Sequence, residues 1–121
     1  MKVAILVLNY NGKALLSTYL GSVVRHKEEA EVWVVDNGST DDSLDLVKKN
    51  FPEVKVLVLD NNFGYTKGYN LAVSKIDADL YCFLNNDVRV NSDWVTPMRQ
   101  LFKTQQHLGF AQPKIVSDQN K

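Results

Sequence analysis

Two carboxylates, Asp36 and Asp87, each follow an apolar run at the point where a turn begins. Asp36 closes the run 32–35, and Asp87 follows the run 80–84 and two asparagines. Unbroken apolar runs are typical of parallel strands that helices cover on both faces, so both carboxylates are predicted at the carboxyl ends of such strands. On its own, Asp36 is equally typical of a residue that opens a turn. The second carboxylate favours one shared site.

The residues around these carboxylates are typical of a nucleotide diphosphate site. Asn85 and Asn86 do not titrate, so Asp87 has no acid–base partner beside it. A lone carboxylate suits Mg²⁺ or Mn²⁺, which completes its shell with phosphate oxygens and water. Asp36 can accept hydrogen bonds from a base N–H or a ribose hydroxyl, and Tyr10 offers a ring on which a base could stack.

Alternating periodicities along the chain predict the elements that position these residues. Polar turns separate short apolar runs from segments whose apolar residues recur at helical spacing. The start of the fourth helix stays open between a cap at Ser92 and a cap at Thr96, and Gly68 inside the third helix requires a structural reason. The predicted strands are 3–8, 31–35, 54–59, 80–84 and 110–116, and the predicted helices are 13–25, 42–50, 67–74 and one within 93–106.

This alternation predicts a doubly wound α/β fold with a mainly parallel sheet in three α/β/α layers. Ligands of such sheets bind beyond the carboxyl ends of the strands, where the strand order reverses. The order three, two, one, four would place the first strand between those that end in Asp36 and Asp87. We then expect Asn9 and Tyr10 to lie with both carboxylates around one crevice.

Length and composition predict an ordinary globular chain. The 121 residues suit one domain, 1–121, and the formal net charge of zero gives no reason to expect nucleic acid as a partner. The single cysteine, Cys82, lies in an apolar run and is interpreted as a structural thiol. The first apolar run is too short to span a membrane, so we expect a cytoplasmic protein without direct membrane insertion. The ending at Lys121 has no closing element, and this indicates a fragment.

Four stretches resemble, in order, the motifs of the family 2 glycosyltransferases with the GT-A fold. They are residues 7–11, 34–41, 61–70 and 83–88, and together they cover nearly the whole chain. Within that family they most resemble the branch that includes rhamnosyl- and galactofuranosyltransferases. The resemblance implies transfer of a sugar from a nucleoside-diphosphate donor to an acceptor hydroxyl, on a saccharide or lipid-linked glycan, with inversion. It also implies a place in cell wall or polysaccharide synthesis, at the inner face of the membrane in a longer protein.

The resemblance also assigns roles to single residues. Asp87 would be the metal-binding last acid of the Asp-X-Asp motif, with Mg²⁺ or Mn²⁺ as cofactor, and Asn85 stands where the first acid is usual. The general base is expected beyond residue 121, so this chain should bind a donor but transfer no sugar alone. The donor-binding residues implied are Asn9, Tyr10, Asn11, Asp36, Asn37, Gly64, Lys67, Asn70 and Asn86.

Two other classes of function compete with this interpretation. A non-catalytic nucleotide-binding or scaffold module is the stronger alternative, because Asn85 replaces an acid and the second half of the domain is missing. A phosphoacceptor receiver domain is the weaker one. Asp60 would be its phosphorylated residue, but such a site needs acids after the first strand, where Asn9, Tyr10 and Asn11 stand.

Overall fold

The computed structural model describes residues 1–104, so the predicted strand 110–116 lies outside the described residues. Strands and helices alternate through this part as the sequence predicts. The elements are β1 (Val3–Asn9), α1 (Lys13–Arg25), β2 (Glu31–Asn37), α2 (Ser43–Asn50), β3 (Lys55–Leu59), α3 (Gly64–Lys75), β4 (Leu80–Asn85) and α4 (Val95–Thr104).

The four described strands form one sheet in the order β3-β2-β1-β4, and all three pairings are parallel. This is the order that places β1 between the strands of Asp36 and Asp87, and the strand order reverses beside β1. Asn9 at the end of β1 pairs in register with Asp36 of β2. This order also excludes the receiver interpretation, because receiver sheets run 2-1-3-4-5.

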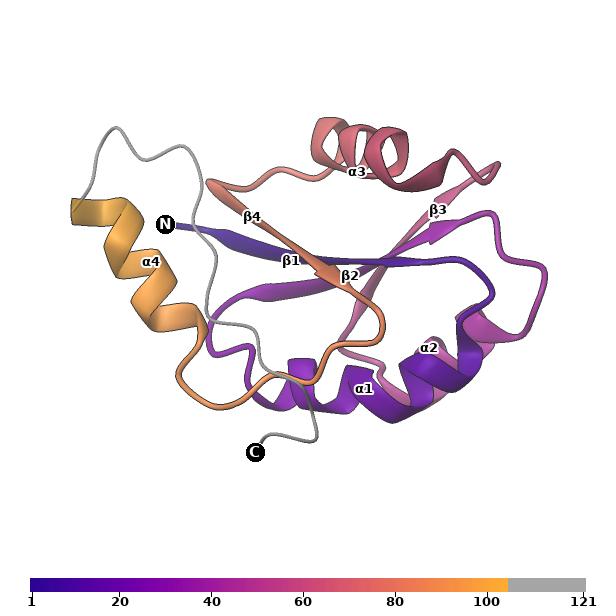
Figure 1. Cartoon of the computed structure of the whole chain (residues 1–121), viewed down its shortest axis with the longest axis horizontal. Helices are drawn as coiled ribbons and strands as arrows, with labels where there is room; N and C mark the ends of the chain where they lie inside the picture. Colours follow the sequence, from indigo (N-terminus) through magenta and orange to yellow (C-terminus); the bar gives the residue numbers. More distant parts are fainter. Residues whose placement is uncertain (105–121) are drawn as a thin grey trace.

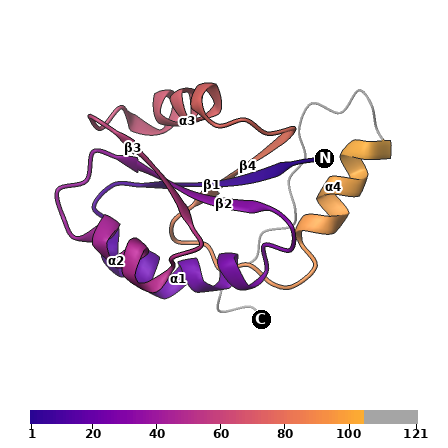
Figure 2. The ribbon, with the colours of Figure 1, turned by 180° about the vertical axis from the view of Figure 1, so that it is seen from behind.

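The sheet is the middle of three layers, which confirms the predicted fold class. Helices α1 and α2 cover one face and α3 covers the other (Figure 1), and the view from behind shows the same layers (Figure 2). Alternate residues of β1 serve the two cores: Ile5 and Val7 pack with α1, while Ala4 and Leu6 pack with α3. Within residues 1–104, each helix is too short or too polar to cross a membrane.

Helix α3 begins at Gly64, three residues before the predicted start at Lys67. Gly64 has a φ of 77°, which favours glycine where the chain turns into the helix. The structure also supplies the reason for Gly68. A Cβ there would lie 3.2 Å from Leu8 Cδ1 and 3.3 Å from Asn37 Nδ2, so glycine lets α3 approach the sheet closely.

Neither predicted start of α4 is right, because the helix begins at Val95. The carboxylate of Glu28 lies at this helix start, where it accepts hydrogen bonds from Thr96 N at 2.7 Å and Thr96 Oγ1 at 2.8 Å. Such bonds satisfy helix donors that lack an intrahelical partner. The two residues are 68 positions apart, so no local pattern could have predicted this cap.

Candidate functional site

The carboxyl edge of the sheet holds a chain of hydrogen bonds across three strand ends. Asn9 Nδ2 donates to Asp36 Oδ1 at 3.1 Å, and Asn9 Oδ1 accepts from Asn86 Nδ2 at 3.1 Å. Asn9 Nδ2 also lies 3.3 Å from Ser39 Oγ. We call these four residues, Asn9, Asp36, Ser39 and Asn86, the amide junction. It joins the loop after β2 to the turn after β4.

Asn9 and Asp36 are covered by protein, with exposed fractions of 0% and 1%. The second oxygen of Asp36, Oδ2, accepts from Ser39 N at 2.9 Å, so both carboxylate oxygens have protein donors. Each oxygen retains a further lone pair. Direct contact of Asn9 or Asp36 with a nucleotide stays a prediction, whereas their contact with each other is observed.

Gly12, immediately before α1, makes room for the junction. A Cβ on Gly12 would lie 2.5 Å from Asn9 Oδ1 and closer still to Asn86 Nδ2. Real side chains do not approach so closely, so only glycine fits here while the two amides stay hydrogen-bonded. Gly12 and Ser39 are the two site residues that the sequence reasoning missed, and a glycine just before a helix was the available signal.

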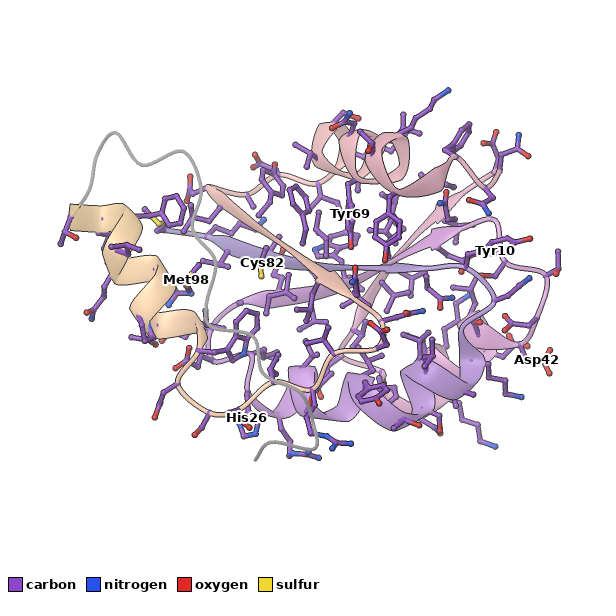
Figure 3. All side chains as sticks on the ribbon, viewed as in Figure 1. Tyr10, His26, Asp42, Tyr69, Cys82 and Met98 are labelled. Carbon is purple, nitrogen blue, oxygen red and sulfur yellow. The ribbon has the colours of Figure 1, made fainter. Side chains whose placement is uncertain are left out.

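A second set of hydrogen bonds ties the loop after β1 to the loop after β2. Asn11 Oδ1 accepts from Thr40 N at 2.7 Å and from Asp41 N at 3.1 Å, and Asn11 N donates to Ser39 Oγ at 2.8 Å. Tyr10 lies beside this tie with 48% of its surface exposed. Figure 3 shows Tyr10 and Asp42 at the same end of the sheet. The ring is thus accessible for stacking.

Asn37 has a different partner set on the other face of the sheet. Asn37 Nδ2 donates to Asn62 Oδ1 at 3.0 Å and to Gly64 O at 3.1 Å, while Asn37 Oδ1 accepts from Phe63 N at 2.9 Å. Asn37 is 2% exposed. It therefore fixes the loop that leads into α3, and its predicted contact with a donor is not tested by this arrangement.

Helix α3 carries the remaining predicted residues on its exposed side. Lys67 and Asn70 are exposed, and Lys67 Nζ lies 4.7 Å from the centroid of the Phe63 ring. In the described part of the chain they belong neither to the amide junction nor to the contacts of Asn37. Asn85 Oδ1 accepts from Tyr65 Oη at 2.8 Å, so Asn85 faces α3 while Asn86 faces the junction.

Asp87 is exposed in the turn directly after Asn86. Within residues 1–104, no three His, Cys, Asp or Glu side chains gather into a metal-binding group. This part of the chain therefore contains no cluster of acidic, His or Cys side chains around Asp87. One exposed carboxylate does fit Mg²⁺ or Mn²⁺ that arrives with a diphosphate, because the phosphate oxygens supply other ligands.

Asp41, Tyr69 and Cys82 have shifted pKa values. Desolvation raises the pKa of Asp41, but hydrogen bonds from Ser43 and from the Lys13 backbone outweigh it, so the pKa stays below its usual value. Burial raises the pKa of Tyr69 to about 12 and that of Cys82 to about 11. A thiol with a raised pKa is a poor nucleophile, which agrees with the structural role predicted for Cys82.

Comparison with known proteins shows where this geometry belongs. The model of the family "Glycosyl transferase family 2" matches residues 4–120. Poly(ribitol-phosphate) beta-N-acetylglucosaminyltransferase TarS of Staphylococcus aureus is 32% identical over an alignment of 99 residues, and the match covers 77% of this chain and 17% of TarS. The uncharacterized glycosyltransferase YfnE of Bacillus subtilis is 28% identical over an alignment of 113 residues, and the match covers 89% of this chain and 29% of YfnE. The chain thus spans less than a third of these relatives.

Solved structures agree with the family. S. aureus TarS 1–349 in complex with UDP-GlcNAc superposes with a TM-score of 0.75 at 28% identity, over 88% of this chain and 32% of that chain. The mannosyltransferase PcManGT from Pyrobaculum calidifontis, in complex with GDP-Man and Mn²⁺, shares the fold with a TM-score of 0.64 at 20% identity, over 75% of this chain and 29% of that one. With a family model that matches nearly every residue, this chain belongs to glycosyltransferase family 2.

Proposed function

We propose that this chain is the donor-binding part of a glycosyltransferase that moves a sugar from a nucleoside diphosphate to an acceptor hydroxyl. The observation that carries the proposal is the amide junction, which joins the Asp36 loop to the turn of Asp87 at one edge of the sheet. TarS, a relative with the same fold, has been solved with UDP-GlcNAc and with UDP.

Each part of this edge suits one part of a nucleotide sugar. The exposed ring of Tyr10 stacks on the base, and Asp36 accepts from the base through its remaining lone pairs. Asp87 holds Mg²⁺ or Mn²⁺ together with the diphosphate. When bound, the cation neutralises charge on the leaving nucleoside diphosphate. Lys67 and Asn70 reach the donor from α3, whose start at Gly64 brings backbone close to it.

The relatives also suggest what the whole protein acts on. Because TarS has been solved with UDP-GlcNAc and its name specifies a poly(ribitol phosphate), we infer a uridine nucleotide sugar and a hydroxyl-bearing cell wall polymer or lipid-linked glycan. The likeness to rhamnosyl- and galactofuranosyltransferases stays a prediction about the sugar. We place the reaction in the cytoplasm, at the inner face of the membrane in a longer protein, with inversion at the anomeric carbon.

The general base belongs outside residues 1–121 in this proposal. No sugar transfer by the chain alone is expected, and acceptor glycosylation by the 121-residue chain would contradict this part. A non-catalytic nucleotide-binding module is the second candidate, favoured by Asn85 in place of an acid. The two candidates differ in the longer protein, which transfers sugar only under the first.

Calorimetric titration with uridine, thymidine and guanosine diphosphates, with and without Mn²⁺, tests donor binding. We expect UDP to bind with Mn²⁺, and we expect Asp87→Ala to weaken this binding at least about tenfold, because the cation then loses its protein carboxylate. Asp77→Ala is the matched control, since Asp77 is exposed but precedes β4 at the opposite edge of the sheet. Equal binding by both variants would refute the metal assignment, and absence of binding by the unaltered chain would refute the function.

A further inference from the structure

We propose that Asn9 and Asn86 are positioning residues that couple the base-binding loop to the metal-binding turn. This inference rests on the proposed function, because it concerns how one nucleotide engages two loops at once. Asn9 lies between those loops, with no exposed surface. Its amide is the link from Asp36 and Ser39 to Asn86.

The chemistry of the junction requires an amide at Asn9. Asp36 Oδ1 and Ser39 Oγ take both N–H groups of the Asn9 amide, while Asn86 Nδ2 needs an acceptor. A short side chain that donates twice and accepts once is asparagine, whereas a carboxylate has no donor and would repel Asp36. The buried amide therefore aligns the ends of β1 and β2 with the turn after β4.

Gly12 restricts the Asn9 and Asn86 amides to one relative position. The Asn9–Asn86 hydrogen bond runs so close to the Gly12 Cα that an added Cβ would overlap both amides. The start of α1 thus fixes where the two amides meet, because close-packed interiors cannot absorb such an overlap. A shift of the Asp87 turn is transmitted through Asn86 and Asn9 to the loop of Asp36 and Ser39.

The coupling predicts that substitutions at the link change the affinity for UDP with Mn²⁺ more than the affinity for uridine. Uridine lacks the diphosphate that would hold a cation at Asp87, whereas UDP with Mn²⁺ must engage both loops in register. Asn86→Ala removes the link but retains the Asn9–Asp36 bond. We expect the ratio of UDP–Mn²⁺ affinity to uridine affinity to fall about tenfold in Asn86→Ala, within the usual range of coupling between sites. A loss of overall stability would lower both affinities together and leave this ratio unchanged.

Gly12→Ala provides the independent test, because it disturbs the same hydrogen bond and deletes no polar group. We expect the same fall in the ratio of UDP–Mn²⁺ affinity to uridine affinity. In the double variant Gly12→Ala/Asn86→Ala this ratio should fall by no more than about tenfold, because two changes that break one link are not additive. Calorimetry of the chain and the three variants, with circular dichroism as a check of folding, gives these ratios. A fall of the ratio by about a hundredfold in the double variant would overturn the proposal, because the two changes would then act independently and Asn86 would affect the donor by a route other than the link.

A measurement on the unaltered chain keeps the proposal testable even if Gly12→Ala does not fold. Uridine carries no phosphate to hold a cation at Asp87, so we expect its binding to shift the Asn86 side-chain amide signal in a ¹H–¹⁵N NMR spectrum through Asn9, and we expect this shift to be lost in Gly12→Ala. An unmoved signal at saturating uridine overturns the coupling. If the unaltered chain binds neither uridine nor UDP, the proposed function fails first. If it binds both and the ratios do not change, only the coupling fails.

Discussion

Asp36 and Asn37 are neighbours at the end of β2, and they organise opposite faces of the sheet. Both are buried, with exposed fractions of 1% and 2%. Asp36 belongs to the amide junction, which lies on the face of the sheet covered by α1 and connects strand ends to one another. Asn37 faces α3 and connects a strand end to the loop 62–64 at the start of a helix.

The difference shows that the amide junction is more tightly enclosed than the α3 side of the same sheet edge. The junction side is enclosed, and Gly12 leaves it no room to move. The α3 side ends in exposed groups: Tyr65 is 59% exposed, and Lys67 is exposed beside it. Under the proposed function, the preformed half suits the nucleoside diphosphate of the donor, and the open half leaves room for different sugars.

The largest effect is expected from Asp36→Ala on the enclosed side. This change leaves buried donors of Asn9 and Ser39 without their charged acceptor, so the free energy of unfolding should fall by about 3 kcal/mol. Urea denaturation measures it. Asp42→Ala is the matched control, because its side chain is 74% exposed and its ion pair with Lys13 is superficial, so a change within about 0.5 kcal/mol is expected. Equal effects of the two variants would show that the junction does not stabilise the fold.

A somewhat smaller effect is expected from Asn37→Ala on the α3 side. The variant loses three neutral hydrogen bonds and should destabilise the chain by about 2 kcal/mol, less than Asp36→Ala because no charged group is involved. Asn70→Ala, an exposed asparagine on α3, serves as the control in the same urea titration. If Asn37→Ala proved the more costly variant, the α3 side would be the more tightly built half.

Alkaline pH is expected to destabilise the chain through the partly buried Tyr69 of α3, by less than the two preceding variants. Burial raises the pKa of Tyr69 to about 12 from an ordinary 10.0, so the folded chain retains a proton that the unfolded chain loses. Stability from this group is present below pH 10.0 and is lost as pH rises towards about 12. The Tyr69 side chain projects from α3 towards the sheet (Figure 3), and its hydroxyl donates to Leu84 O at 3.0 Å. Tyr69→Phe should flatten the fall of the thermal midpoint in this window, whereas the exposed Tyr10→Phe should not.

The sequence predicts the α/β fold well, because alternating strands and helices with right-handed crossovers form a parallel sheet, although this alternation leaves the strand order open. It also brings Asp36 and the turn of Asp87 to the same edge of the sheet. It does not predict that Asn9 lies fully inside, because the contacts of its amide come from residues 27 and 77 positions away. Nor does it predict the cap of α4 by Glu28. Residue type and spacing identify which strand ends meet, whereas side-chain burial depends on packing that periodicity does not encode.

The smallest effect is expected from Tyr65→Phe, at the exposed end of the α3 side. The change removes only the hydrogen bond from Tyr65 Oη to Asn85, and both residues are exposed, so water replaces the lost partner. We expect the urea midpoint to move by less than the equivalent of about 0.5 kcal/mol. A loss as large as that of Asn37→Ala would mean that Tyr65 and Asn85 hold α3 to β4 as firmly as Asn37 holds it to β2. The open half of the edge would then be as fixed as the junction, and the proposed freedom for different sugars would have no structural basis.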